Sequence, residues 1–135
     1  MLNFANINYL AVLVATIAAY FFGALWYSSV LFGRTWLRAL GKSKEELPSP
    51  TLPMLINFIL AFITALGLAL LIKSLGVVTL LGGILIGLVV AIAFIVTNTL
   101  SEYLYSGASM KLFWIYAGYR VVYILIMGAI LGVWQ

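Results

Sequence analysis

The residue of greatest chemical interest is Arg120, the one charge placed well inside an apolar run. It lies eight residues into the run 112–134, or about 12 Å along a helix that rises about 1.5 Å per residue. A guanidinium at that depth in a membrane needs a counter-charge, a water-filled cavity or a route to the interface. Ionisable groups inside spans mark functional sites, so Arg120 is the first candidate for holding a ligand.

Other polar side chains are expected at a depth similar to that of Arg120. Tyr116, Arg120 and Tyr123 share one helix face, because they are spaced by four and then three residues. Long helical side chains lean toward the helix N-terminus, which directs Arg120 toward Glu102 and Asn98 at the end of the preceding run. The predicted polar cluster consists of Arg120, Glu102, Asn98, Asn57, Tyr116, Tyr123 and Tyr27.

Three interpretations of this predicted cluster stay open at the level of sequence. The first is an internal network of ion pairs and hydrogen bonds that fixes helix packing. The second is a binding site or vestibule open to the cytoplasm, in which Arg120 holds a small polar or anionic solute among tyrosines. In the third, Glu102 alone acts as a proton-coupling carboxylate.

The elements that position this cluster are membrane spans. Of 135 residues, 66% are hydrophobic and 7% charged, a balance far from that of soluble domains. Four apolar runs of 19 to 23 residues, 9–31, 54–72, 80–100 and 112–134, match the ~20 residues that a helix needs to cross a bilayer. The sequence therefore predicts an all-α polytopic membrane protein, with residues 1–135 forming a single four-helix transmembrane domain.

Basic residues predict the orientation of these spans. The connections 32–53 and 101–111 lie on one side of the membrane and carry five basic residues, whereas Lys73 stands alone on the other side. Because cytoplasmic loops are enriched in Lys and Arg, we expect both connections in the cytoplasm and both termini outside the cell membrane. The five residues are Arg34, Arg38, Lys42, Lys44 and Lys111.

The segment 32–47 has the pattern of a short interfacial amphipathic helix. Phe32, Trp36 and Leu40 recur at four-residue spacing, and a basic stripe recurs in the same way on the opposite face. Such a helix can lie in the interface with its aromatics down and its cations toward anionic headgroups. A basic loop that only sets topology is the alternative. The predicted membrane-surface residues are Arg34, Trp36, Arg38 and Lys42.

Absences narrow the chemistry further. The chain contains no Cys and no His, and only three carboxylates. These counts argue against disulfides, Cys/His zinc sites, haem ligation by histidine and His-dependent hydrolysis. We therefore expect no catalytic residues, no metal, no cofactor and no nucleic-acid partner, and we do not expect an enzyme.

Small residues recur at four-residue spacing in every span, a pattern that lets helices approach closely. Gly83 and Gly87 form such a pair in the third span, and Gly128 and Gly132 form one in the fourth. Four short helices can hardly enclose a pathway, so a homo-oligomer is a further expectation.

Two motifs carry a family resemblance. The first is Gly23-Ala24-Leu25-Trp26-Tyr27 with Phe32-Gly33 and Trp36, and the second is Gly118-Tyr119 and Met127-Gly128 ahead of Leu131-Gly132. On these motifs the chain resembles small four-span membrane proteins catalogued as domain of unknown function 1761. The resemblance spans nearly the whole chain and implies an integral membrane protein without an established activity. By physical role, Trp26 and Tyr27 are expected near the headgroups, and Gly33 at a bend.

Three functions remain open from the sequence, and a membrane enzyme, which we do not expect, is the third. The first is a transporter- or channel-like oligomer that binds a small polar or anionic solute in the cluster on the cytoplasmic side. The alternative is a structural or partner-binding membrane subunit without transport activity.

Overall fold

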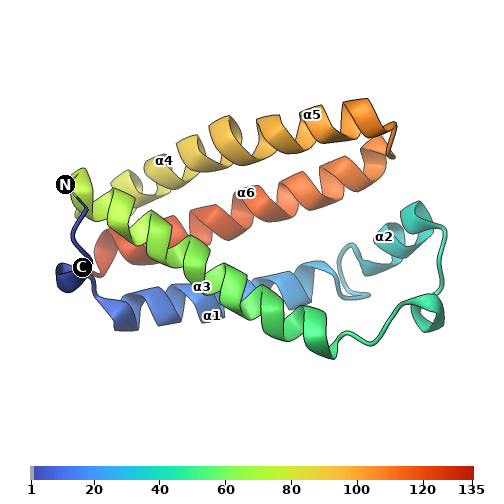
Figure 1. Ribbon diagram of the computed structural model, residues 1–135, viewed down its shortest axis with the longest axis horizontal. Coiled ribbons are helices and arrows are strands. Elements are labelled where there is room, and N and C mark those ends of the chain that lie inside the picture. The colour runs from blue at the N-terminus through green and yellow to red at the C-terminus, as the bar shows by residue number, and fades with distance from the viewer. Residues whose placement is uncertain (1) are drawn as a thin grey trace.

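The computed structural model describes residues 2–135, which form a bundle of long helices with short helices at the ends (Figure 1). Four helices are long and apolar enough to cross a membrane, which confirms the predicted all-α polytopic class. They are α1 (Tyr9–Trp26), α3 (Thr51–Ser74), the third span Leu80–Ser106 and α6 (Met110–Val133). The short helices are η1 (Phe4–Asn6), α2 (Gly33–Leu40) and η2 (Lys44–Glu46).

The third span is built from three segments in one continuous rod. It begins with α4 (Leu80–Val90), passes through a π-helix, η3 (Ala91–Val96), and ends with α5 (Thr97–Ser106). The hydroxyl of Thr79 caps its start by accepting from the amide of Gly82 at 3.0 Å. Gly107 closes its end in the left-handed conformation, with φ 67°.

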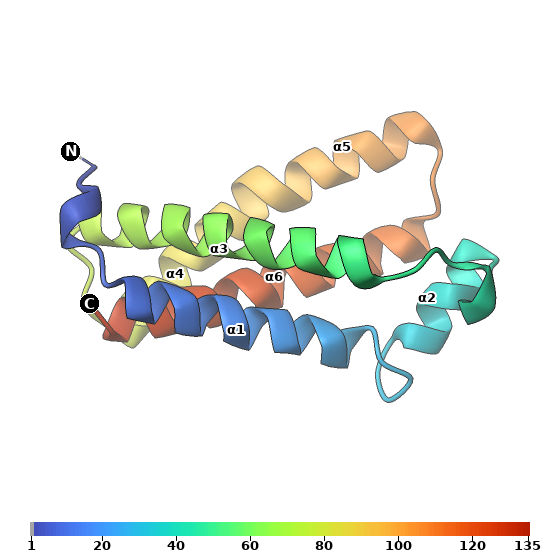
Figure 2. The same ribbon diagram turned by 60° about the horizontal axis from the view of Figure 1, so that its bottom comes forward.

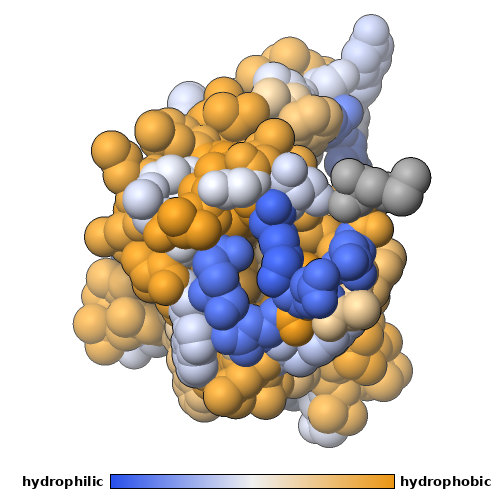
Figure 3. Space-filling view, turned by 90° about the vertical axis from the view of Figure 1, so that its left-hand side faces the viewer, coloured by the Kyte–Doolittle hydropathy of each residue, from blue (hydrophilic) through white to orange (hydrophobic). Residues whose placement is uncertain are grey.

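The two ends of the bundle differ in what they carry. Both termini and the α3–α4 turn lie at one end, the terminal end, whereas α2 and the α5–α6 turn lie at the other, the α2 end (Figures 1 and 2). At the terminal end, hydrophilic side chains gather within an apolar surround (Figure 3). The Lys73 ammonium there donates to the carbonyl of Asn6.

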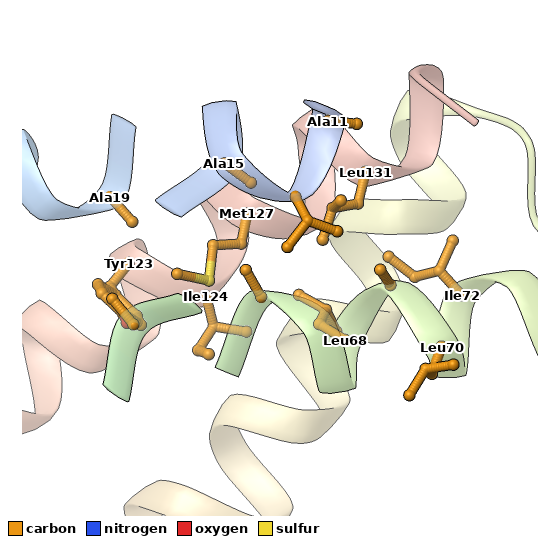
Figure 4. Packing of buried hydrophobic residues seen from close by; sticks show 14 of the residues in the cluster. Ala11, Ala15, Ala19, Leu68, Leu70, Ile72, Tyr123, Ile124, Met127 and Leu131 are labelled. Atoms are coloured by element: carbon orange, nitrogen blue, oxygen red, sulfur yellow. The ribbon is translucent and has the colours of Figure 1, made fainter. Parts of the chain in front are cut away.

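Helix α6 is the central element of the bundle. In its most apolar window 50% of the residues are buried, against 33% in α1 and α3 and 17% in the third span. Its side chains Tyr123, Ile124 and Met127 pack against residues of α1 and α3 in the core (Figure 4). The large apolar side chains left outside this core form the surface that a bilayer would cover.

Glycines allow α4 to approach α6 backbone to backbone at the terminal end. A Cβ atom on Gly83 would collide with the carbonyl oxygen of Gly128, and one on Gly128 would collide with that of Gly83. A Cβ atom on Gly132 would collide with the carbonyl of Thr79. The small-residue spacing in these two spans therefore serves contacts within the chain.

The first span is shorter than predicted, ending at Trp26 rather than at residue 31. Turns replace the last helical residues: the amide of Phe32 donates to the carbonyl of Trp26, and that of Gly33 donates to the carbonyl of Ser28 at 2.9 Å. A side chain at Gly33 would collide with this turn, so only glycine fits the bend into α2. The hydrophobicity of the run 9–31 does not show where the helix ends, because backbone hydrogen bonds in the following turn determine that end.

Each of the other spans extends beyond at least one of its predicted ends. Helix α3 starts at Thr51 instead of 54, and the third span continues to Ser106 instead of 100. Helix α6 starts two residues earlier than predicted and ends at Val133. The polar residues at these ends interrupt the apolar pattern, but their backbone groups still make helical hydrogen bonds.

The π-helix changes which residues of the third span face α6. The buried stripe of α4 reaches Ala91, and an uninterrupted α-helix would continue it through Asn98 and Glu102, seven and eleven residues on. A π-turn holds about one residue more than an α-turn, so it rotates everything that follows. Thr99 and Tyr103 are half-buried as a result, whereas Asn98 and Glu102 are exposed.

The glycine contact predicts a large difference between two glycine-to-alanine variants. Gly83→Ala forces α4 away from α6 and should destabilise the protein by about 1–3 kcal/mol, as overpacking does. Gly67→Ala on α3 is the control, because a Cβ atom there meets nothing within 4 Å; it should be neutral or stabilising by about 0.5–1 kcal/mol. Chemical unfolding in detergent measures both, and equal effects would contradict this contact.

Candidate functional site

Aromatic rings fill the bundle where α1 leads into α2. The Tyr27 ring packs edge-on against Trp36 and against Tyr119, with ring centroids 5.4 and 5.3 Å apart. Tyr103 of α5 reaches this group by packing 6.4 Å from Tyr116. Such edge contacts each add about 0.5–1.5 kcal/mol beyond the area they bury. Burial raises the pKa of Tyr27, just beyond α1, so its phenol stays neutral.

Two tryptophans connect this aromatic group to α6 by hydrogen bonds. The Trp36 indole N–H donates to the hydroxyl of Tyr116 at 2.7 Å, and that of Trp26 donates to the carbonyl of Ile115 at 3.1 Å. The Trp36 indole is therefore turned toward α6, and its predicted place at the membrane surface stays a prediction. Trp26 likewise lies against α6, because its N–H finds a protein acceptor there.

Arg120 lies on the exposed part of α6, with its guanidinium carbon 5.4 and 5.7 Å from the ring centroids of Tyr119 and Tyr123. At these distances both rings attract the cation. Both tyrosines are buried, with Tyr119 6% and Tyr123 3% exposed. The two rings therefore form a fixed floor that holds the guanidinium from one side.

The region around Arg120 is open because its neighbours diverge toward the α2 end. Helix α5 has no buried residue, and α3 has none between Thr51 and Leu60. In Figure 1, α3 runs beside α1, and α6 lies between this pair and α5. Figure 2 shows α5 diverging from α1 and α3 toward the α2 end. We call this part of α6, between α3 and α5 and carrying Arg120, the open face.

The structure does not pair Glu102 with Arg120. Both side chains are exposed, and within residues 2–135 neither has an ion-pair partner. The amide nitrogen of Asn98 donates to the carbonyl of Phe94 at 2.6 Å, a bond within its own helix. The hypothesis of an internal ion pair between Glu102 and Arg120 therefore does not describe the single chain.

The remaining predicted residues lie in three places. Tyr116, Tyr123 and Tyr27 belong to the aromatic group, and Asn57 is half-buried on α3 without a side-chain hydrogen bond to that group. The basic residues Arg34, Arg38 and Lys42 are exposed on and just after α2, as expected for contact with headgroups. Whether they bind lipid stays a prediction.

Sequence reasoning missed Tyr119, on which the floor under Arg120 depends. The available signal was Gly23, because a Cβ atom there would lie 2.6 Å from the Tyr119 hydroxyl. A glycine in one span and a large ring in another can indicate such a fit, but only once the two spans are known to be neighbours.

Small cavities occur away from the open face. Two of them lie at the terminal end and share Ile7 and Lys73 in their linings. Within the same residues no group of three or more His, Cys, Asp or Glu could hold a metal ion. The chemistry at the open face therefore depends on a guanidinium, tyrosines and a separate carboxylate.

Comparison with known proteins gives one match. The family described as "Protein of unknown function (DUF1761)" matches residues 10–132, nearly the whole chain, in agreement with the resemblance carried by the two sequence motifs. No curated protein and no solved structure matches the chain.

The bond between Trp36 and Tyr116 predicts measurable coupling between α2 and α6. Trp36→Phe and Tyr116→Phe should each destabilise the protein by about 1 kcal/mol, because each leaves a polar partner without its bond. The double variant should cost less than the sum of the two, by about 0.5–1 kcal/mol. Trp114→Phe, at a site 68% exposed on the same helix, is the control and should change little. Additive losses would show that α2 is not held through this bond.

Proposed function

Since the chain belongs to the DUF1761 family, whose description carries no activity, we propose from the geometry that this membrane protein binds an anionic group at Arg120. The ligand sits on the open face of α6, between α3 and α5. Binding of this kind is the first step of transport. The protein would then act as a transporter- or channel-like oligomer.

One observation carries the proposal: Arg120 lies deep in a span, and no carboxylate of the described chain neutralises it. It is ten residues from the start of α6 at Met110, or about 15 Å along the helix. Placing an unpaired charge at such depth in a membrane costs several kcal/mol, and charged residues inside spans therefore mark functional sites. An anion on the open face would supply the missing counter-charge.

The open face also suggests from which side the ligand enters. Arg34, Arg38, Lys42, Lys44 and Lys111 all belong to the α2 end, and this bias assigns that end to the cytoplasm. The Arg120 side chain leans toward the N-terminus of α6, which is the same end. A ligand then enters from the cytoplasm or from the cytoplasmic leaflet.

A structural or partner-binding subunit is the second candidate. It is favoured by the close α4–α6 contact, which packs these two spans within the chain. Flux measurements in reconstituted vesicles separate the two functions. Movement of a solute that stops in Arg120→Gln supports transport, and a partner that co-purifies in fixed ratio supports the subunit.

Anion binding at Arg120 is tested by thermal unfolding with octyl phosphate, a simple amphiphilic anion. Tenfold above its dissociation constant, a ligand stabilises the folded state by about 1.4 kcal/mol, which raises the midpoint by about 5 °C in a chain of this size. Arg120→Gln should remove the rise, and Arg120→Lys should keep part of it because the charge is retained without the planar fork.

Lys111→Gln is the matched control, since Lys111 is an exposed cation on the same helix. It should leave the midpoint shift unchanged. A shift of equal size in wild type and Arg120→Gln would refute anion binding at this residue.

A further inference from the structure

We propose that the ligand of the open face is a zwitterionic membrane lipid whose headgroup carries a phosphate and a primary ammonium. Arg120 binds the phosphate, and Glu102 binds the ammonium. This inference rests on the proposed function and names its ligand. The lipid comes from the leaflet at the α2 end, and its acyl chains lie along α3 and the third span.

Two free charges of opposite sign carry the inference. Glu102 and Arg120 lie on adjacent spans, both are exposed, and neither has an ion-pair partner within the described residues. A ligand with a single negative charge would satisfy Arg120 and be repelled by Glu102. A ligand with both charges satisfies the two residues at once.

Helix handedness places both charges beside the open face. Glu102 and Asn98 each come one position before Tyr103 and Thr99, the half-buried residues of α5. One position turns a side chain by about 100° around the helix. Because α5 is right-handed and runs antiparallel to α6, this turn directs Glu102 to the side of α5 nearer α3.

The depths of the two charges match the order of groups in a lipid headgroup. Glu102 is four residues from the end of α5 at Ser106, whereas Arg120 is ten residues from the start of α6. The two Cα atoms thus lie about 6 Å and 15 Å from that end of the bundle, with Arg120 leaning back toward it. The phosphate, which is attached to the acyl part, lies deeper, and the ammonium lies nearer water.

The arrangement of Arg120 suits a phosphate in particular. The Tyr119 and Tyr123 rings attract the Arg120 guanidinium from one side. No hydrogen bond to another side chain uses its N–H groups within residues 2–135. The planar fork is therefore available for the bidentate contact that guanidinium groups make with phosphate oxygens.

The surroundings favour a lipid over a soluble zwitterion. The helices on either side of the open face expose large apolar side chains, including Leu60 on α3 and Phe94 on η3, which are 53% and 66% exposed. A small soluble molecule would leave these side chains uncovered. Acyl chains cover them and stay continuous with the bilayer.

Binding of three phospholipids with identical acyl chains tests the assignment, using native mass spectrometry of the full-length protein in detergent. Phosphatidylethanolamine should bind about tenfold more tightly than phosphatidylglycerol, which lacks the ammonium. It should also exceed phosphatidylcholine, whose quaternary ammonium donates no hydrogen bond to a carboxylate. Glu102→Gln should abolish the preference over phosphatidylglycerol, and Arg120→Gln should weaken binding of all three lipids.

Glu45→Gln is the matched control for Glu102→Gln, because Glu45 is an exposed carboxylate in η2. It should retain the lipid preference. If Arg120→Gln weakens binding while Glu102→Gln leaves the preference intact, the headgroup assignment is wrong although anion binding stands. If Arg120→Gln changes nothing, the proposed function fails as well.

Two further outcomes would overturn the lipid assignment. Soluble phosphoethanolamine that binds as tightly as the lipid would show that acyl chains contribute nothing. Loss of a dimer in both Arg120→Gln and Glu102→Gln would show that each charge pairs with the opposite charge of a second copy of the chain.

Discussion

The close contact between Gly83 of α4 and Gly128 of α6 is the constraint on which the rest of the bundle depends. It brings two backbones together at the terminal end, where no side chain separates them. At the other end the same two spans meet through large rings, with Tyr103 packed 5.8 Å from Phe113. Glycine at one end and aromatic rings at the other make the spans diverge. That divergence leaves the face with Arg120 uncovered.

Arg120 is held by neighbouring side chains, whereas Glu102, its expected partner, is not. Tyr119 and Tyr123 face the core and hold the Arg120 guanidinium from beneath. The π-helix, by contrast, turns Glu102 away from the contact stripe of α5. π-Helical turns are rare and frequently occur at functional sites. Here the turn keeps a carboxylate and a guanidinium apart on adjacent helices, at the expense of an internal ion pair.

Much of this fold could be predicted from hydrophobicity and charge. Four spans follow from the lengths of the apolar runs, and the shared depth of Tyr116, Arg120 and Tyr123 follows from helical spacing. The end of α1 at Trp26 could not be predicted, because backbone bonds in the next turn determine it. The bond from Trp36 to Tyr116 depends on which spans are neighbours. The rotation of Glu102 depends on a single extra residue in one turn, which hydrophobic periodicity does not reveal.

We propose that Arg120 is kept for binding and not for stability. The most direct test is a stability cycle in an uncharged detergent free of phospholipid, with wild type, Arg120→Gln, Glu102→Gln and the double variant. Our account predicts that Arg120→Gln is at least as stable as wild type and that the two changes add within about 0.5 kcal/mol. Strong destabilisation by each single change, with the double variant no worse, would contradict it and identify a structural ion pair.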